Sequence, residues 1–392
     1  MIFSRKTYIP LFIALLFSQC AVNLRAQSSL HVFRGNLQHD GVYKTKNISE
    51  KSKYKWGFKT GGMVRSTPAV ANGIVYFGSG DKNFYALDTA GGKLKWKFQT
   101  EGAISSSPVL SGNMVCFLSS DNNLYCLNAQ DGKLLWKFKT GEDLNSSVVF
   151  RRNGGWDYYL SSPVISFEMV YFGGGDGYLY ALNLKSGEMK WRYKTEGLIR
   201  SSPAIDLGTI YFGSFDGNLY ALDALSGRAK WKFKTAGSQY FPKGEIQSSP
   251  AISDSMVYFG SRDGNLYAVN VQTGEASWKF DHEGSWVITS PAVANGLVFA
   301  GSSDGQFFQA LDAKTGKEKW RFKTSANVFS SPVVTDSTVY FGCWNGIVYG
   351  VNIDSGVATW GYYFEGPVQS SPVISNGVMY VGCDDGYMYA LE

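Results

Sequence analysis

The residues that could carry chemistry in this sequence are three histidines, five cysteines and a set of Asp-Gly pairs. The histidines, His31, His39 and His282, are too few and too scattered to predict a metal cluster. No nucleophile–base pair can be assigned from the spacing. Each Asp-Gly pair supplies one carboxylate, whereas calcium takes about six to eight oxygen ligands, so these pairs predict turns. We therefore expect no catalytic residue and no metal ligand.

The cysteines lack metal-binding spacing, because no Cys-x-x-Cys pair occurs. Cys116 and Cys126 flank a predicted hairpin and could face each other. An oxidising compartment would allow a disulfide between them. Two buried thiols are an equally good expectation, so the sequence leaves both alternatives open.

The N-terminus has the pattern of a targeting segment. Two basic residues precede an apolar run at 8–17, which is too short for the about 20 residues of a transmembrane helix. We expect residues 1–26 to be a signal peptide that is cleaved after Ala26. Lipidation of Cys20 is the alternative, although the residues before it match a lipobox poorly. Both routes export the protein, to the periplasm, to the outer membrane or out of the cell.

Export changes the charge that the folded protein carries. The formal net charge is +5, and residues 1–26 contain three basic residues and no acid, so cleavage leaves +2. Most lysines recur at one strand of each repeat and do not form a single basic face. Nucleic-acid binding is therefore not expected.

A repeat of about 40 residues runs through the chain. Its tryptophans are Trp56, Trp96, Trp136, Trp191, Trp231, Trp278, Trp320 and Trp360. A Ser-Pro or Thr-Pro step recurs between them, with its proline at Pro68, Pro108, Pro163, Pro203, Pro250, Pro291, Pro332 and Pro372. This period is typical of four-stranded propeller blades.

One unit displays the strands of a blade. Strand-forming residues at 201–206, 209–214, 219–223 and 228–235 are separated by Asp-Gly and Ser-Gly turns. In the corresponding fourth strand at 93–98, lysine alternates with large apolar residues, which predicts an outer strand with one solvated side. The chain is thus predicted to be an all-β, eight-bladed propeller.

The ends of the repeat region predict how the ring closes. The last unit stops at Glu392 after its third strand, and Trp56 has no unit before it. We expect the strand around Trp56 to complete the last blade, which removes the free sheet edges. The propeller then occupies residues 51–392, after a lead-in at 27–50.

Two segments carry a family resemblance. Residues 85–96, YALDTAGGKLKW, and residues 310–320, ALDAKTGKEKW, resemble the PQQ-enzyme repeat of quinoproteins. Residues 33–41, FRGNLQHDG, are similar to the segment that often precedes such repeats. In length, export and blade count, the chain is similar to the BamB family of outer-membrane assembly propellers. The quinoprotein resemblance implies PQQ with calcium, but those enzymes commonly have adjacent cysteines, which this chain lacks, so no cofactor is expected.

Function is most readily sought where the repeat is broken. Insertions lie within 141–159 and between Trp231 and Pro250, and both join a fourth strand to the next first strand. That connection lies on the same face of the propeller as the Asp-Gly turns. On this face, the residues that precede the Ser-Ser-Pro-like steps should together surround the mouth of the channel. The predicted binding face consists of Arg65, Arg200, Gln247, Phe329, Gln369, Trp156, Tyr158, Tyr159, Tyr240, Phe241 and Trp344. We expect these anchors to be exposed and their replacement to leave folding nearly unchanged.

Three functions fit these features. The first is a non-catalytic exported scaffold that binds an envelope protein or peptide, with a BamB-like role in outer-membrane protein assembly. The alternative is a propeller that binds a glycan or small ligand, because aromatic insertions suit stacking on sugars. The third is a PQQ-dependent dehydrogenase.

Overall fold

The computed structural model describes residues 32–49, 51–144 and 159–392. The expected signal peptide and Cys20 lie outside the described residues. All regular elements in the described part of the chain are β-strands, and it contains no helix of the length and apolarity that crossing a membrane requires.

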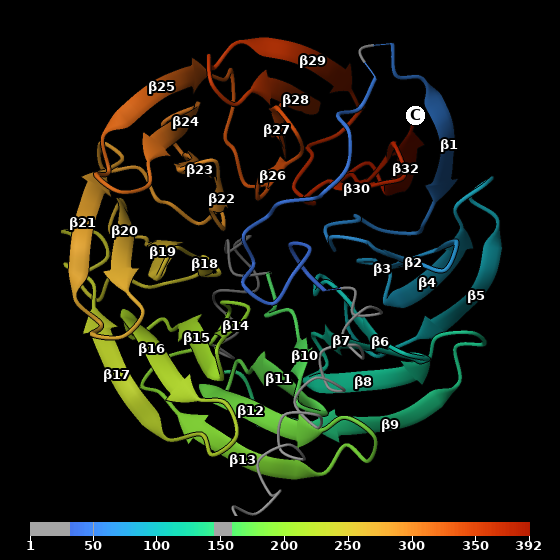
Figure 1. Ribbon diagram of the computed structural model, residues 1–392. Coiled ribbons are helices and arrows are strands. Elements are labelled where there is room, and N and C mark those ends of the chain that lie inside the picture. Colours follow the sequence, from blue (N-terminus) through green and yellow to red (C-terminus); the bar gives the residue numbers. More distant parts are fainter. Residues whose placement is uncertain (1–31, 50, 145–158) are drawn as a thin grey trace, which may run out of the picture.

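The strands form eight four-stranded antiparallel sheets arranged in a ring (Figure 1). This confirms the predicted eight-bladed propeller. Within each blade the first strand lies beside the central channel and the fourth lies on the outer rim (Figure 1).

The blades are numbered from the first complete unit. Blades 1 to 4 contain β2 (Ala69–Ala71), β3 (Ile74–Gly78), β4 (Asn83–Asp88), β5 (Leu94–Gln99); β6 (Val109–Ser111), β7 (Met114–Ser119), β8 (Asn123–Asn128), β9 (Leu134–Lys139); β10 (Val164–Ser166), β11 (Met169–Gly173), β12 (Tyr178–Asn183), β13 (Met189–Lys194); and β14 (Ala204–Asp206), β15 (Thr209–Gly213), β16 (Asn218–Asp223), β17 (Ala229–Lys234). Blades 5 to 8 contain β18 (Ala251–Ser253), β19 (Met256–Gly260), β20 (Asn265–Asn270), β21 (Ala276–Asp281); β22 (Ala292–Ala294), β23 (Leu297–Gly301), β24 (Phe307–Asp312), β25 (Glu318–Lys323); β26 (Val333–Val334), β27 (Thr338–Gly342), β28 (Ile347–Asn352), β29 (Ala358–Tyr363); and β30 (Val373–Ser375), β31 (Val378–Gly382), β32 (Tyr387–Leu391), β1 (Tyr54–Lys59).

The first strand of the chain closes the ring, as predicted. β1 pairs antiparallel with β32, and Trp56 lies opposite Ala390. Lys53 and Glu392 extend the pairing through two backbone hydrogen bonds of 2.7 and 3.0 Å. Blade 8 therefore contains both ends of the repeat region, so the ring cannot open without losing a complete strand pair.

The repeated residues hold neighbouring blades together. The indole of Trp191 donates a hydrogen bond of 3.1 Å to the carbonyl of Ala224 in the next blade. Gly227 lies against that indole with φ of 69°, and a Cβ there would come within 2.7 Å of the ring. The Ser-Pro steps form a second belt, in which the backbone N–H of Ser162 donates to Ser202 Oγ at 2.9 Å. The repeated tryptophan, glycine and serine are therefore structural.

The two cysteines of blade 2 face each other, on β7 and β8. Cys116 lies directly opposite Cys126 in the strand register, and both are fully buried free thiols in this structure. Burial, reinforced by the neighbouring Cys126, raises the pKa of the Cys116 thiol well above its ordinary value.

The lead-in crosses the centre of the ring on the face opposite the Asp-Gly turns (Figure 1). Carbonyls of residues 37–41 accept backbone hydrogen bonds from the inner strands of four successive blades, whose donors are Ile205, Ile252, Val293 and Val334. Phe33, earlier in the lead-in, extends into the channel and lines the pocket at the mouth on the other face. The lead-in thus ties blades 4 to 7 together and closes one end of the channel.

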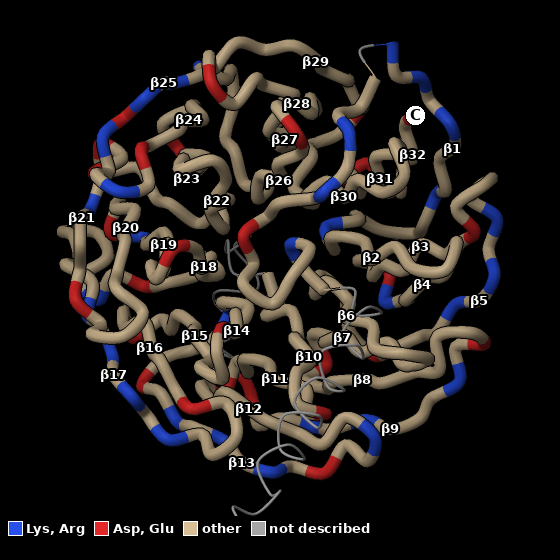
Figure 2. The backbone as a smooth tube through the Cα atoms, in the orientation of Figure 1, with Lys and Arg blue, Asp and Glu red and all other residues tan. Residues whose placement is uncertain are grey.

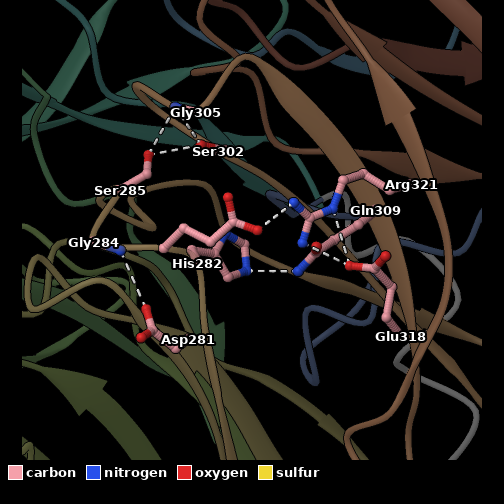
Figure 3. A network of polar contacts seen from close by, with 10 residues as sticks. Asp281, His282, Gly284, Ser285, Ser302, Gly305, Gln309, Glu318 and Arg321 are labelled. Atoms are coloured by element: carbon pink, nitrogen blue, oxygen red, sulfur yellow. Dashed lines mark hydrogen bonds and ion pairs between the residues drawn. The ribbon is translucent and has the colours of Figure 1, made fainter.

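Two buried histidines are held neutral. Burial and the nearby Arg34 lower the pKa of His39 to about 3, and neither ring nitrogen has a hydrogen-bond partner among the described residues. Burial and Arg321 likewise lower the pKa of His282 to about 3. His282 stands where most blades have a threonine, and its Nε2 lies 2.8 Å from the amide nitrogen of Gln309 (Figure 3).

These histidines predict acid destabilisation. Their folded pKa lies below the unfolded value of about 6.5, so the stabilisation is complete above that pH and is lost as the pH falls towards 3. Each should contribute a slope of about 1.4 kcal/mol per pH unit in this window. The variant His282→Thr should lack the contribution of one histidine to the pH slope of the unfolding free energy. Urea unfolding between about pH 7 and pH 4 measures this slope. Lys317→Ala, on an exposed turn, should keep the full slope; an equal slope for both variants would contradict the prediction.

Candidate binding face at the channel mouth

The Asp-Gly turns and the loops between blades lie on one face. The backbone N–H of Gly61, at the start of the loop into blade 1, donates to Asp81 Oδ2 of that blade's turn at 2.7 Å. Gly237 makes the equivalent bond to Asp263 at 3.1 Å. The insertion that begins at Ala236 therefore lies on the turn face. Trp156 and Tyr158 belong to the other insertion and lie outside the described residues.

The turn carboxylates are used within the turns. Asp81 Oδ2 also accepts the hydroxyl of Tyr85 at 2.7 Å, and the same Tyr–Asp bond recurs in most blades. Burial would raise the pKa of Asp81, but the bonds from Tyr85 and the backbone hold it below its ordinary value. Burial, and then the bond to Asp81, raises the pKa of Tyr85. In these blades the turn carboxylate thus serves as a local structural acceptor.

One pocket occupies the mouth of the channel, with a volume of about 70 Å³. The residues that precede the Ser-Ser-Pro-like steps all contribute to its wall, and they are Arg65, Ser105, Leu160, Arg200, Gln247, Ile288, Phe329 and Gln369. Tyr159 joins them from the end of the first insertion, and Phe33 closes the far end. The ring order of the repeat therefore sets the order of side chains around the mouth.

An arginine–carboxylate pair spans the junction of blades 8 and 1. Arg65 holds Asp384 through two bonds, with Nε 2.9 Å from Oδ1 and Nη2 2.8 Å from Oδ2. The amide of Gln369 donates to the same carboxylate, and Tyr159 donates its hydroxyl to Gln369 Oε1. These bonds orient four polar side chains around one side of the mouth.

A second pair corrects one sequence-based expectation. Arg200 Nη2 lies 2.5 Å from Asp143 Oδ2, and only 6% of the arginine side chain is exposed. The sequence predicts Arg200 to be an exposed anchor whose removal leaves folding nearly unchanged. It is instead a buried member of an ion pair, because the first insertion brings Asp143 over it. Gln247, Phe329 and Gln369 are buried as well.

Aromatic side chains surround a third arginine, Arg262. Its guanidinium carbon lies 4.7 Å from the ring centre of Phe215, 5.6 Å from Trp286 and 5.8 Å from Phe241. Phe241 and Trp286 meet edge to face at 4.6 Å, which anchors the tip of the second insertion. Tyr240, next to it, is 82% exposed. Such a cage fixes the cation while leaving Tyr240 available for contact.

Trp344 contacts Phe329 edge to face at 5.2 Å. It occupies the position immediately before a turn, and so do three mouth residues that the sequence analysis missed, Phe215, Arg262 and Asp384. The variation from blade to blade that singled out Trp344 would have identified all three. Asp143 and Trp286 carry no comparable signal, since they lie in loops between blades.

A larger pocket, of about 510 Å³, lies beside the mouth over blades 1 to 3. Met63, Ile104 and Leu160 give it an apolar wall, and the Arg200–Asp143 pair forms its polar edge. A hollow with mixed walls can accept apolar side chains and orient a polar group.

Comparison with known proteins identifies the family. The family model described as outer membrane protein assembly factor BamB matches residues 46–156, 151–282 and 242–381. The chain belongs to the BamB family. Among solved structures it is similar to BamB from Moraxella catarrhalis, with 19% identity and a TM-score of 0.70 over 87% of this chain and 97% of that one. No curated protein matches the sequence significantly.

Quinoprotein enzymes share the fold of this BamB family member. A europium-containing methanol dehydrogenase matches with 14% identity and a TM-score of 0.79, over 95% of this chain and 100% of that one. The quinohemoprotein alcohol dehydrogenase of Comamonas testosteroni matches with 14% identity and a TM-score of 0.78, over 95% of this chain and 82% of that one. At these identities the likeness concerns the fold alone.

The described mouth residues do not fit the metal ion that would accompany PQQ. Within the described ranges, no group of three or more His, Cys, Asp or Glu side chains is placed to hold a metal. Asp384 and Asp143 are each paired with an arginine, and the two guanidinium groups would repel a cation.

Proposed function

We propose that this protein is a non-catalytic envelope scaffold that binds a protein or peptide through the channel-mouth face. The observation that carries the proposal is the gathering of repeat-breaking side chains on one rigid face. Arginine pairs, an aromatic cage and the exposed Tyr240 surround two pockets there. Interfaces draw most of their binding energy from a few Arg, Trp and Tyr anchors, and the exposed ring of Tyr240 is placed to act as one.

Membership of the BamB family supports a role in outer-membrane protein assembly, and with it an exported location. A closed propeller suits a scaffold, because its loops are held by a framework that need not move. The alternative ligand is a glycan, for which the aromatic cluster of Phe241, Trp286 and Tyr240 offers stacking surfaces.

Site-specific photo-crosslinking in intact cell envelopes tests the proposal. A crosslinker at Tyr240 should give a discrete protein adduct, and one at Lys317, on an exposed turn of the opposite face, should not. Equal adducts from both positions, or none from Tyr240, would count against the mouth face. Binding of oligosaccharides but not of protein at Tyr240 would favour the glycan alternative.

Titration with the crosslinked partner measures the anchors. Tyr240→Ala should weaken binding by about 1–3 kcal/mol and leave the melting temperature unchanged, because its exposed ring contributes little to folding. Lys317→Ala serves as the matched control and should bind like the parent protein. If Tyr240→Ala and Lys317→Ala bind equally well, Tyr240 is not an interface anchor.

A further inference from the structure

The outer rim of the propeller is protected by charge everywhere except in blade 7. Figure 2 shows basic residues along the outer strands of the other blades and none along β29. The six residues of β29, ATWGYY, carry no charge, whereas each of the other seven outer strands carries at least one lysine. Lysines on an edge strand prevent pairing with another chain, so β29 lacks this protection.

The edge of β29 is open. In the described part of the chain it pairs only with β28. Every second residue of such a strand directs its backbone N–H and C=O outward, where another strand can pair with them. A shallow groove of about 510 Å³ runs along the same two strands, lined by Ile347, Tyr349, Trp360, Tyr362 and Tyr363.

Gly361 leaves this part of the rim uncovered. It stands where β5 has Lys97 and β17 has Lys232. A Cβ at Gly361 would meet only Val348 O at 3.7 Å and a methyl of Ile347 at 3.8 Å, which are ordinary contacts. Space therefore does not require glycine here, and a longer side chain would cover the groove.

The charges at the two ends of β29 indicate what could pair with it. Residues 324–392 contain six acidic residues and no lysine or arginine, although the whole chain has a net charge of +5. Two of these acids flank β29, since Asp354 precedes it and Glu365 follows it. Both are exposed, and neither has a basic partner among the described residues. The edge thus has an uncharged centre between two carboxylates.

We propose that β29 binds an extended peptide segment of a partner protein as a fifth strand of blade 7. The segment has uncharged β-forming residues at its centre and lysine or arginine at both ends, facing Asp354 and Glu365. Backbone bonds to the edge provide affinity, and the groove receives alternate side chains. A second copy of this protein fits less well, because two convex rims would meet along one strand of about 20 Å. Such a contact is small beside the about 1,200–2,000 Å² of a stable interface.

A labelled ten-residue peptide, KKVTVTVTKK, tests this edge by fluorescence anisotropy. We expect saturable binding to the full protein and binding weaker by at least about tenfold for the charge-reversed peptide EEVTVTVTEE. Gly361→Lys, which introduces the lysine that four other blades have at this position, should weaken binding of the lysine peptide by about tenfold while keeping the melting temperature. Leu225→Lys adds the same charge on an exposed turn of blade 4 and should bind like the parent.

Hydrogen exchange of the backbone amides distinguishes strand pairing from side-chain stacking, because stacking alone would not slow the exchange. Peptide binding should slow exchange of backbone amides within 358–363. Equal affinity of Gly361→Lys and the parent, or unchanged exchange in β29, would overturn the proposal. A dimer that Gly361→Lys dissociates would overturn it in favour of a second copy. Tyr240→Ala should leave peptide binding unchanged, so failure here is distinguishable from failure of the mouth-face proposal.

Discussion

Replacing Trp56 with alanine is expected to lower the free energy of unfolding by about 4 kcal/mol. Trp56 is 6% exposed, packs beside Tyr380 at 5.9 Å and donates its indole N–H to the carbonyl of Thr89 at 3.0 Å. Its loss removes a large buried side chain from the strand that closes the ring. Gly92, which lies against this indole, would then face a cavity. Urea unfolding followed by circular dichroism measures the change.

Trp360→Ala is the matched control for Trp56→Ala. Trp360 holds the same repeat position in blade 7, but it is only half-buried. Its replacement should cost clearly less than that of Trp56. If both variants lose the same free energy of unfolding, the position of Trp56 in the closing strand adds nothing to its contribution to stability.

Arg200→Ala is expected to destabilise the fold by about 3 kcal/mol, because it leaves the carboxylate of Asp143 poorly solvated and without its guanidinium. Removing both partners, in Arg200→Ala with Asp143→Ala, should cost less than the two single replacements added together. Thermal and urea unfolding of the four proteins of this cycle provide the measurement. Strict additivity would show that the pair does not couple.

The same cycle bears on binding at the mouth. If Arg200 mainly holds Asp143 in place at the mouth, the double variant should bind the partner more weakly even where its stability recovers. Tyr240→Ala, by contrast, removes an exposed ring without disturbing an ion pair. Comparing the two separates direct contact from positioning of the loop.

Much of the fold could be predicted because its determinants are local. Trp191, Gly227 and the Ser-Pro steps recur at a nearly constant spacing, and each makes the same contact with the neighbouring blade. A repeated contact with a fixed neighbour specifies both the blade and the number of blades. The strand bounds were predictable for the same reason. The four strands expected within 201–235 form β14 to β17, and the observed ends differ from the expected ends by at most three residues.

The shared face of the irregular side chains was predictable from the sequence, but their pairing was not. Strand topology alone indicated that Arg65, Arg200 and Trp344 share a face, because alternate connections of an up-and-down blade lie on the same side. It gave no signal that Arg200 is buried against Asp143, which lies 57 residues earlier, in an insertion longer than any other connection between blades. Arg262 was missed although the varied position before each turn contained the necessary signal.

The sequence by itself determined the blade count, the closing strand and the face that carries the irregular loops, since each depends on spacing along the chain. Only the tertiary structure decided which charges are paired and which surfaces stay open. Arg65 meets Asp384 across 319 residues, and the lead-in ties four blades together at its own positions 37–41. Contacts between segments so far apart produce no repeating pattern in the sequence, because each occurs only once. The closed ring determines which residues meet.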